Sequence, residues 1–223
     1  MIRVFIGYDP AETVAFHVLG HSILRHASRP VAITGLRLPQ LAMWRERDPL
    51  QSTEFAFSRF LVPHLCGYQG RAIFMDCDML CRADIAGLWG AVPAEFAVGV
   101  VKHDYTPAAS VKFRGQAQTT YPRKNWSSVM AFNAERCKVL TPDYVNEASG
   151  LALHGFQWLR DDEIYGLQME WNHMVGEYAP NPDAKLVHFT QGTPCFEQYA
   201  ECEFAREWYE EMTRMLEYKE AGQ

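Results

Sequence analysis

The chain has 223 residues, which suits one large domain, and 48% of them are hydrophobic, which is enough to fill a sizeable core. Its formal net charge is −6 and no basic stripe runs through it, so the sequence argues against nucleic acid or an anionic membrane surface as a partner. No apolar run is long enough to span a bilayer, and the first residues read as a strand and not as a signal peptide. Six cysteines without a C-x-x-C pair are typical of a cytoplasmic protein with reduced thiols.

The first third of the chain predicts a β-α-β unit followed by a further strand. Apolar residues follow a strand pattern over residues 2–7 and 31–36, and a helical pattern with a broad apolar face over residues 12–26. A second helix is predicted over residues 52–65, where phenylalanines recur at helical spacing, and a strand over residues 71–76 follows it. Because a short turn and a helix connect the first two strands, we expect a parallel sheet.

The rest of the chain alternates short elements around one long polar segment. The further predicted elements are a helix over 84–89, strands over 96–101 and 127–133, helices over 141–148 and 161–169, strands over 171–178 and 185–189, and an amphipathic helix over 203–219. Residues 105–126 carry four basic side chains in an otherwise acidic protein: Lys112, Arg114, Arg123 and Lys124. A polar segment of this length predicts either a lid over an anionic ligand or a plain surface loop.

Two aspartates mark the end of the buried strand that begins at Arg71. The apolar run stops at Met75, and Asp76 and Asp78 follow with a single residue between them. In an open α/β sheet, ligands bind at the carboxyl ends of the strands, and alternation puts residues i and i+2 on the same side of an extended segment. Paired carboxylates suit a hard cation such as Mg²⁺ or Mn²⁺. The alternative is that the two aspartates cap a turn.

Several stretches in this order resemble a known family. They are residues 4–9, the segment 53–59, residues 74–78, the strand 127–133, the acidic run 161–163 and residues 187–192. Together they resemble a nucleotide-diphospho-sugar transferase of the GT-A fold, closest to the retaining enzymes of glycosyltransferase family 8. The resemblance implies a single α/β domain with a Rossmann-like, mixed but mainly parallel central sheet flanked by helices. Its nucleotide-binding part would span about 1–104 and its acceptor side about 105–223.

The resemblance implies a metal site made of Asp76, Asp78 and His188. These residues would hold Mn²⁺ or Mg²⁺ against the diphosphate of the donor. Charge builds on the nucleoside diphosphate as the glycosidic bond breaks, and a divalent cation stabilises that charge without needing a proton. A structural role for His188 at the end of its strand is the alternative.

The resemblance also implies a set of residues around the nucleotide. Tyr8 would stack on the base, Asp9 would bind a uracil N–H or a ribose hydroxyl, and Arg59 would project towards the donor. Cys77 would contact the ribose through its backbone, and Gly192 would let the backbone approach the diphosphate. An alternative for Arg59 is a surface arginine whose stem lies on apolar side chains.

The sequence departs from the family where the diphosphate would bind. Family members carry a lysine shortly after the metal-binding histidine, whereas residues 191–196 contain none. Lys102, Arg123 or Lys124 would then supply the positive charge.

An acidic run matches the position beneath the donor sugar. The resemblance makes Asp161 and Asp162 the catalytic candidates. A carboxylate there either attacks the sugar covalently or stabilises an oxocarbenium-like species. The alternative is that these acids simply favour the start of a helix.

The sequence therefore predicts a metal-dependent glycosyltransferase that transfers a sugar from a UDP-sugar to an unknown acceptor, with retention. A sugar nucleotidyltransferase is one alternative, but it would carry a Gly-rich basic loop after the first strand, and residues 7–10 do not. A non-catalytic nucleotide-sugar-binding module would not need Asp78, His188 and Asp162 together. A phosphohydrolase with Asp76 as its nucleophile would need more acidic ligands, which only the run 161–163 offers. The oligomeric state stays open.

Overall fold

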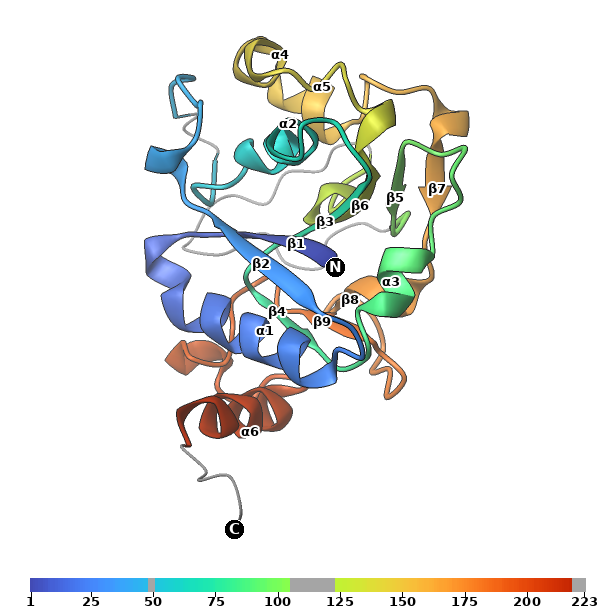
Figure 1. Ribbon diagram of the computed structural model, residues 1–223. Helices are drawn as coiled ribbons and strands as arrows, with labels where there is room; N and C mark the ends of the chain where they lie inside the picture. The colour runs from blue at the N-terminus through green and yellow to red at the C-terminus, as the bar shows by residue number, and fades with distance from the viewer. Residues whose placement is uncertain (48–50, 105–122, 218–223) are drawn as a thin grey trace.

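The computed structural model describes residues 1–47, 51–104 and 123–217. It contains a six-stranded sheet and a smaller three-stranded sheet, with helices on both sides of the larger one (Figure 1). The 18 positions from 105 to 122, where most of the predicted lid falls, lie outside the described residues. All six cysteines are free, as the sequence predicts. Within the described ranges, no helix combines the length and the apolar character that a membrane crossing requires.

The larger sheet has the strand order β2-β1-β3-β6-β5-β7. Its strands are β1 (Ile2–Gly7), β2 (Val31–Leu36), β3 (Arg71–Met75), β5 (Val98–Val100), β6 (Val129–Asn133) and β7 (Ile164–Gly166). Strands β2, β1 and β3 run parallel, β7 runs parallel to β5, and only β6 is antiparallel to its neighbours. The predicted fold class, a mixed and mainly parallel sheet flanked by helices, is confirmed.

Burial explains why the first strands form where they do. The side chains of Ile2, Val4 and Ile6 on β1 are fully buried, as are nearly all of those on β3. A strand covered on both faces reads as a continuous apolar run, and this is the pattern at both places. Strand β2 lies at the edge of the sheet and is only partly buried.

The smaller sheet brings a late part of the chain next to the end of β3. It consists of β4 (Met79–Cys81), β9 (Leu186–His188) and β8 (His173–Met174). Only residues 76–78 separate β3 in the larger sheet from β4 in the smaller one. Strand β9 pairs antiparallel with β4 so that His188 lies opposite Met79. This register carries His188 to the turn between the two sheets.

The helices form layers on either side of the larger sheet (Figure 1). The helices are α1 (Thr13–His26), α2 (Val62–Leu65), α3 (Ala86–Gly90), α4 (Pro142–Glu147), α5 (Gly150–His154) and α6 (Ala205–Leu216). Helix α1 packs against β4 and α6 on one side, whereas α2, α4 and α5 gather on the other. Thr141 and Ser149 cap α4 and α5 by accepting a backbone N–H two to three residues into each helix.

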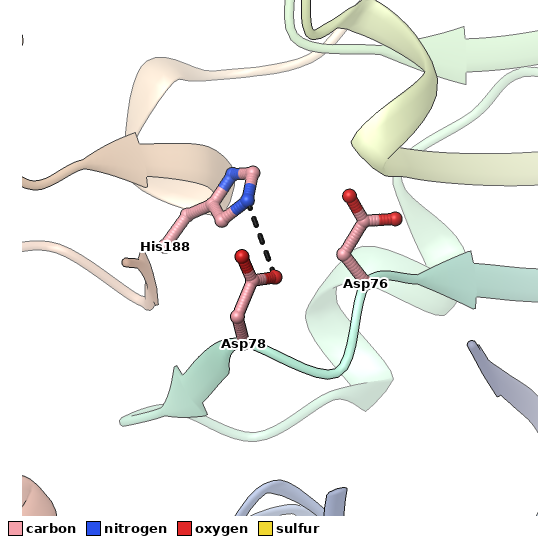
Figure 2. Close-up of side chains that lie close together, drawn as sticks. All are labelled: Asp76, Asp78 and His188. Carbon is pink, nitrogen blue, oxygen red and sulfur yellow. Dashed lines mark ion pairs between the residues drawn. The ribbon is translucent and has the colours of Figure 1, made fainter. Parts of the chain in front are cut away.

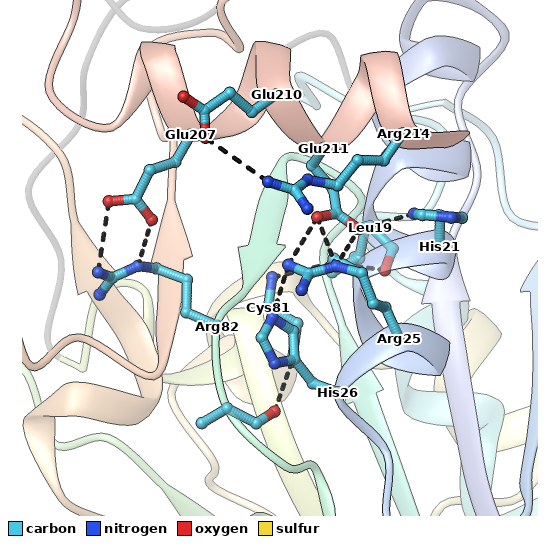
Figure 3. A network of polar contacts seen from close by, with 12 residues as sticks. Leu19, His21, Arg25, His26, Cys81, Arg82, Glu207, Glu210, Glu211 and Arg214 are labelled. Atoms are coloured by element: carbon cyan, nitrogen blue, oxygen red, sulfur yellow. Dashed lines mark hydrogen bonds and ion pairs between the residues drawn. The ribbon is translucent and has the colours of Figure 1, made fainter. Parts of the chain in front are cut away.

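A buried carboxylate fastens the last helix to the first. Glu211 of α6 lies 2.6 Å from His21 Nδ1 and 2.8 Å from Arg25 Nε, both on α1 (Figure 3). Trp208, one turn earlier, is fully buried and belongs to the core beneath α6. The amphipathic pattern that predicts this helix is thus explained by its contact with α1 and β4.

The predicted helix over residues 52–65 is wrong for most of its length. Turns occupy residues 53–57, a 3₁₀ helix covers Ser58–Leu61, and only α2 at Val62–Leu65 is α-helical. The backbone N–H of Glu54 donates to Asp9 Oδ2 at 3.1 Å, so a distant side chain holds this segment in its turns. Tertiary contacts have overridden the helical spacing of the phenylalanines.

Two predictions in the second half also differ from the structure. Where a helix was predicted over residues 161–169, a 3₁₀ turn at Asp161–Glu163 leads into β7. Ile164 and Tyr165 favour a strand, and β5 offers an open edge for them to pair with. The strand predicted over 171–178 shrinks to β8, because a 3₁₀ helix at Met169–Asn172 precedes it and Gly176 turns with φ +78° after it.

Candidate functional site

Three potential metal ligands come together at the junction of the two sheets. Asp76 follows β3, Asp78 precedes β4, and His188 ends β9. One oxygen or nitrogen atom from each lies within 4.8 Å of the others, and Figure 2 shows the three side chains converging. Among the described residues, this is the cluster with the donor set and spacing that a divalent cation needs.

His188 is buried, Asp76 and Asp78 are partly buried, and both carboxylates are incompletely satisfied. Asp76 Oδ1 lies 2.9 Å from Arg59 Nη1, and Asp78 Oδ1 lies 3.4 Å from His188 Nε2. Both oxygens are nevertheless buried without a well-formed hydrogen bond from the described residues. Buried polar atoms of this kind are rare in folded proteins and commonly mark the binding site of an ion or a polar ligand. Two such oxygens beside an imidazole fit a divalent cation.

Burial and mutual repulsion shift the pKa values of these groups. Burial raises the pKa of Asp76 to about 6, and the nearby Asp78 carboxylate adds to the rise while Arg59 opposes it. Burial alone would lower the pKa of His188, but Asp78 and Asp76 outweigh it and leave that pKa above its usual value. Two carboxylates are thus crowded together at this junction, an arrangement that a bound divalent cation would stabilise.

Glu12 lies beside the cluster, and sequence reasoning did not identify it as a site residue. It is 2% exposed, and Cys77 donates from Sγ to its Oε2 at 3.5 Å. Burial first, and then repulsion by Asp78, raise the pKa of Glu12 to about 9, so it is protonated at neutral pH. Its position at the start of a helix predicts only a favourable contact with the helix dipole, and no motif in the sequence indicates its nearness to Asp78.

Tyr8 and Asp9 follow β1 near the turn 76–78, and the two side chains differ in burial and in hydrogen bonding. Asp9 is buried, and its carboxylate accepts from Ala11 N at 2.9 Å and from Glu54 N, so it holds two loops together. Tyr8 is half-buried, and its hydroxyl lies 3.0 Å from Thr13 Oγ1. The ring of Tyr8 thus retains an accessible surface on which a base could stack.

Arg59 is a buried part of the site and not a surface residue. It is 6% exposed, donates from Nη1 to the backbone oxygen of Ser127 at 2.9 Å, and pairs with Asp76. Its guanidinium carbon lies 5.0 Å from the ring centre of Phe74, within the range of a cation–π contact. Arg59 therefore contacts the metal-ligand cluster through its ion pair with Asp76.

The remaining predicted donor residues lie around the same junction. Cys77 is fully buried between the two aspartates, with its thiol on Glu12. Gly192 has φ +142°, and a Cβ added there would overlap the ring of Tyr199, so its packing alone requires glycine. Lys102 follows β5 and lies 5.8 Å above the ring centre of Trp126.

Lys124 and Arg123 immediately follow the part of the chain that is not described. Lys124 is 8% exposed, whereas Arg123 lies 5.3 Å from the ring centre of Trp126, near Lys102. Positive charge therefore gathers around Trp126, beside the end of β5, although no lysine follows His188. Asp104, the last described residue before position 105, is exposed.

Asp161 and Asp162 are not members of the Asp76, Asp78 and His188 cluster. Their side chains are 85% and 74% exposed and pair with Arg123 and Arg160. They precede β7, and the next residue, Glu163, accepts from Ala97 N at the start of β5. The residues before β7 adjoin the start of β5, but Asp161 pairs with Arg123, which packs on the same Trp126 ring as Lys102 after the end of β5.

A cavity opens beside the segment that follows His188. It has a volume of about 350 Å³ and is lined by Phe189, Gly192, Tyr178, Tyr199 and Glu203, among others. Tyr178 links it to the interior, because its hydroxyl lies 2.9 Å from Nδ1 of the buried His103. Burial, and then the nearby His188, lower the pKa of His103 to about 3, so its ring is neutral at physiological pH.

Comparison with known proteins identifies the family. The sequence model of glycosyl transferase family 8 matches residues 22–139, just over half of the chain. The chain belongs to glycosyl transferase family 8. It is also 46% identical over 221 residues to Protein CDI of Arabidopsis thaliana, a match that covers 94% of this chain and 85% of that protein. A family 8 member is a glycosyltransferase, so the predicted enzyme class is confirmed.

Solved structures of glycosyltransferases share the fold. The galactosyltransferase LgtC matches with a TM-score of 0.60 at 11% identity, covering 98% of both chains. The bifunctional glycosyltransferase WbbM matches with a TM-score of 0.63 at 14% identity, and GlyE of Streptococcus pneumoniae with 0.59 at 14%. The chain spans 49% of the length of WbbM and 66% of that of GlyE. At these identities the likeness concerns the fold alone, which is that of GT-A glycosyltransferases.

Proposed function

We propose that this family 8 enzyme is a metal-dependent transferase that moves a sugar from a nucleotide-diphospho-sugar, a UDP-sugar, to an acceptor. The observation that carries the proposal is the Asp76, Asp78 and His188 cluster with its two unsatisfied carboxylate oxygens. It lies where the chain leaves the carboxyl end of β3, the side of an α/β sheet on which nucleotides bind. The LgtC structure, which shares this fold, was solved with donor and acceptor sugar analogues.

The chemistry follows from the charge of the cluster. When bound, Mn²⁺ or Mg²⁺ would be held by Asp76, Asp78 and His188, and it would supply positive charge to the departing diphosphate. Arg59 keeps Asp76 in place from the opposite side through its ion pair. Arg59 and His188 are buried and the two aspartates are partly buried, which strengthens their interactions with a charged ligand, since water screens them less.

Other residues receive roles in the proposal from their placement. The exposed face of Tyr8 would stack on the base, and Asp9 would shape the nucleotide pocket through the loops it holds. The backbone around Cys77 and Gly192 would lie along the ribose and the diphosphate. Lys102 and Lys124 would supply the positive charge that family relatives take from a later lysine.

The acceptor side of the reaction is the more open part of the proposal. The cavity beside Phe189 and Gly192 adjoins the strand that carries His188, and its tyrosines and Glu203 offer the mixture of ring faces and hydrogen-bond acceptors that sugars favour. We infer retention of configuration from the family. A catalytic role for Asp161 or Asp162 would place the donor sugar towards Arg123 and Trp126, because Asp161 pairs with Arg123. The free cysteines suit a cytoplasmic enzyme.

The experiment is incubation of the protein with Mn²⁺ and a panel of nucleotide sugars in the absence of acceptor. We expect slow release of UDP from one UDP-sugar, abolished by EDTA and restored by added Mn²⁺. Release of pyrophosphate from a nucleoside triphosphate and a sugar phosphate would instead identify a nucleotidyltransferase. Binding of a nucleotide sugar with no turnover, with or without acceptor candidates, would contradict the enzymatic proposal and favour a binding module.

A further inference from the structure

The side-chain amide of Asn172 is fully buried and contacts both His188 and Ser128. It ends the 3₁₀ helix at Met169–Asn172, just before β8. Its Oδ1 lies 3.0 Å from His188 Nδ1, and its Nδ2 lies 2.8 Å from Ser128 Oγ. His188 Nδ1 is the ring nitrogen that points away from Asp78, since Nε2 faces Asp78 Oδ1. Asn172 therefore holds the histidine from behind.

The direction of these hydrogen bonds is fixed by a backbone carbonyl. The hydroxyl of Ser128 donates to the backbone oxygen of Asn125 at 2.7 Å, so Ser128 Oγ has to accept from Asn172 Nδ2. The same amide nitrogen lies 3.5 Å from the oxygen of Asn125, which can only accept. Asn172 thus turns its oxygen to His188, and the hydrogen of the His188 ring has to be on Nδ1. The lone pair of the neutral ring is then on Nε2, the atom that faces Asp78.

Asn172 also joins the two sheets from which the cluster is built. His188 belongs to the smaller sheet, whereas Asp76 continues β3 of the larger one. The backbone oxygen of Ser128 accepts from Asp76 N at 3.0 Å, while its hydroxyl accepts from Asn172. A continuous set of hydrogen bonds therefore runs from His188 through Asn172 and Ser128 to the backbone of Asp76. It bridges the sheets at the place where their separation sets the distances within the cluster.

We propose that Asn172 is a positioning residue of the metal site, which holds His188 in the Nδ1–H tautomer with Nε2 free for the metal. The proposal rests on the proposed function in taking Asp76, Asp78 and His188 as the metal ligands. Partners that orient a ligating histidine in this way typically contribute about 10–100-fold to metal affinity. No sequence pattern identifies Asn172 as a site residue, because its contacts form only where the two sheets meet.

The test compares Mn²⁺ binding by the metal-free protein and two substitutions of similar size. Titration followed by the electron paramagnetic resonance signal of free Mn²⁺ gives the affinity without any turnover. We expect Asn172→Leu, which removes the acceptor, to weaken binding by about 10–100-fold. Asn172→Asp keeps an oxygen facing His188 Nδ1, and the Ser128 hydroxyl can turn to donate to it, so we expect its affinity to lie within about threefold of the wild type.

A spectroscopic readout separates positioning from general packing. The ¹⁵N shifts of His188 in the metal-free protein at alkaline pH report which ring nitrogen carries the hydrogen. We expect Nδ1–H in the wild type and in Asn172→Asp, and Nε2–H, facing Asp78, in Asn172→Leu. An unchanged tautomer in Asn172→Leu would overturn the proposal even if that variant were less stable.

Asn146 provides a matched control for the loss of a buried amide. It is 7% exposed, and its Oδ1 accepts from Trp44 N at 2.7 Å and Arg45 N at 2.9 Å, away from the cluster. We expect Asn146→Leu to lower the melting temperature but to leave Mn²⁺ affinity unchanged. Equal losses of affinity in Asn146→Leu and Asn172→Leu would overturn the proposal.

Ser128→Ala covers the case in which Asn172→Leu fails to fold. It keeps the contact between Asn172 and His188 but frees the amide to rotate, so we expect a mixture of His188 tautomers and a smaller loss of Mn²⁺ affinity. A single Nδ1–H tautomer with wild-type affinity would contradict the proposed relay. Absence of Mn²⁺ binding by the wild type would contradict the proposed function itself, and is thereby distinguished from a failure of the inference about Asn172.

Discussion

Two carboxylate clusters in this protein, one buried and one partly buried, are satisfied in different ways. Glu211, between α6 and α1, receives hydrogen bonds from Arg25 and His21 (Figure 3). Burial alone would raise the pKa of Glu211, but these hydrogen bonds and charges outweigh it and lower that pKa. Asp76 and Asp78, at the junction of the sheets, keep buried oxygens without a well-formed hydrogen bond (Figure 2). Burial raises the pKa of Asp76, and the nearby Asp78 adds to the rise, although Arg59 opposes it.

The difference separates a carboxylate that supports the fold from carboxylates that wait for a ligand. A buried charge with its partners in place stabilises or is neutral, whereas one without partners costs free energy. The α6 cluster is complete as it stands. The junction cluster has the guanidinium of Arg59 on Asp76 and an imidazole on Asp78, and a bound cation would satisfy the oxygens that remain. Substitutions in the two clusters should therefore change different properties of the protein.

The largest expected effect is that of Asp78→Ala on activity. Removing this carboxylate takes away a proposed metal ligand, so we expect metal-dependent release of UDP to fall by about 100-fold or more. The metal-free protein should melt at the same or a higher temperature, because an unsatisfied buried charge is lost. Asp143→Ala, at an exposed acid on α4, is the control and should change neither quantity. A large fall in melting temperature with normal activity would reverse the roles assigned to the two clusters.

The next effect is that of Glu211→Leu on stability. The substitution leaves Arg25 and His21 without their partner, but both are partly exposed and can be hydrated. We expect the free energy of unfolding to fall by about 1–3 kcal/mol, or roughly 3–10 °C in melting temperature, with Mn²⁺ affinity unchanged. Glu210→Leu on the same helix removes an exposed carboxylate and should have little effect. Loss of Mn²⁺ affinity in Glu211→Leu would mean that the two clusters are coupled.

The pH dependence of stability should have opposite signs at the two clusters. The pKa of Glu12 is raised from 4.5 to about 9, so the folded state holds this proton more tightly than the unfolded chain does. The contribution of Glu12 to the free energy of unfolding is fully present below pH 4.5 and is lost as the pH rises towards 9. The pKa of Glu211 is lowered, so its contribution is present above its unfolded pKa and is lost as pH falls through the lowered value.

Glu12→Gln isolates the first of these trends. Glutamine mimics the neutral carboxylic acid and cannot ionise, so the metal-free variant should melt higher than the wild type in alkaline solution, by about 4–10 °C, and similarly in acid. Differential scanning calorimetry across this pH range measures the trend. Parallel melting curves for variant and wild type would show that Glu12 ionises as it does in the unfolded chain. Added Mn²⁺ should reduce the alkaline loss in the wild type.

The smallest effect is expected at the acidic run before β7. Asp162 is exposed and pairs with the exposed Arg160, so Asp162→Asn should change the melting temperature by less than about 2 °C. Because its carboxylate is exposed and lies outside the Asp76, Asp78 and His188 cluster, we expect UDP release and sugar transfer to stay within about threefold of the wild type. Loss of transfer with normal UDP binding would instead restore the catalytic role that the family resemblance assigns to Asp162.

The sequence predicts those features that are local in the chain and misses those that depend on distant contacts. The apolar run before Asp76 predicts both a buried strand and its acidic end, because burial and alternation are local patterns. His188 was found through the family resemblance, and register with β4 brings it to Asp78. Glu12 and Asn172 carry no such pattern, because their environment exists only once two sheets and a helix start have met.

The two wrongly predicted helices, over 52–65 and 161–169, also reflect distant contacts that the local sequence does not show. Phenylalanines at helical spacing predict a helix over 52–65, but the carboxylate of Asp9 holds Glu54 in a turn. The acids at 161–163 resemble a helix start, yet Ile164 and Tyr165 pair with β5. In both places a tertiary contact outweighs a local preference that is worth only about 1 kcal/mol over a few residues.

The most direct measurement is a crystal structure of the protein soaked with Mn²⁺ and UDP, with data collected near the manganese absorption edge. An anomalous peak bounded by Asp76, Asp78 and His188, with the diphosphate of UDP on its open side, is the predicted result. UDP bound in the fold without a peak there, or a peak at another set of residues, would contradict the central claim that this cluster is a metal site for the leaving group.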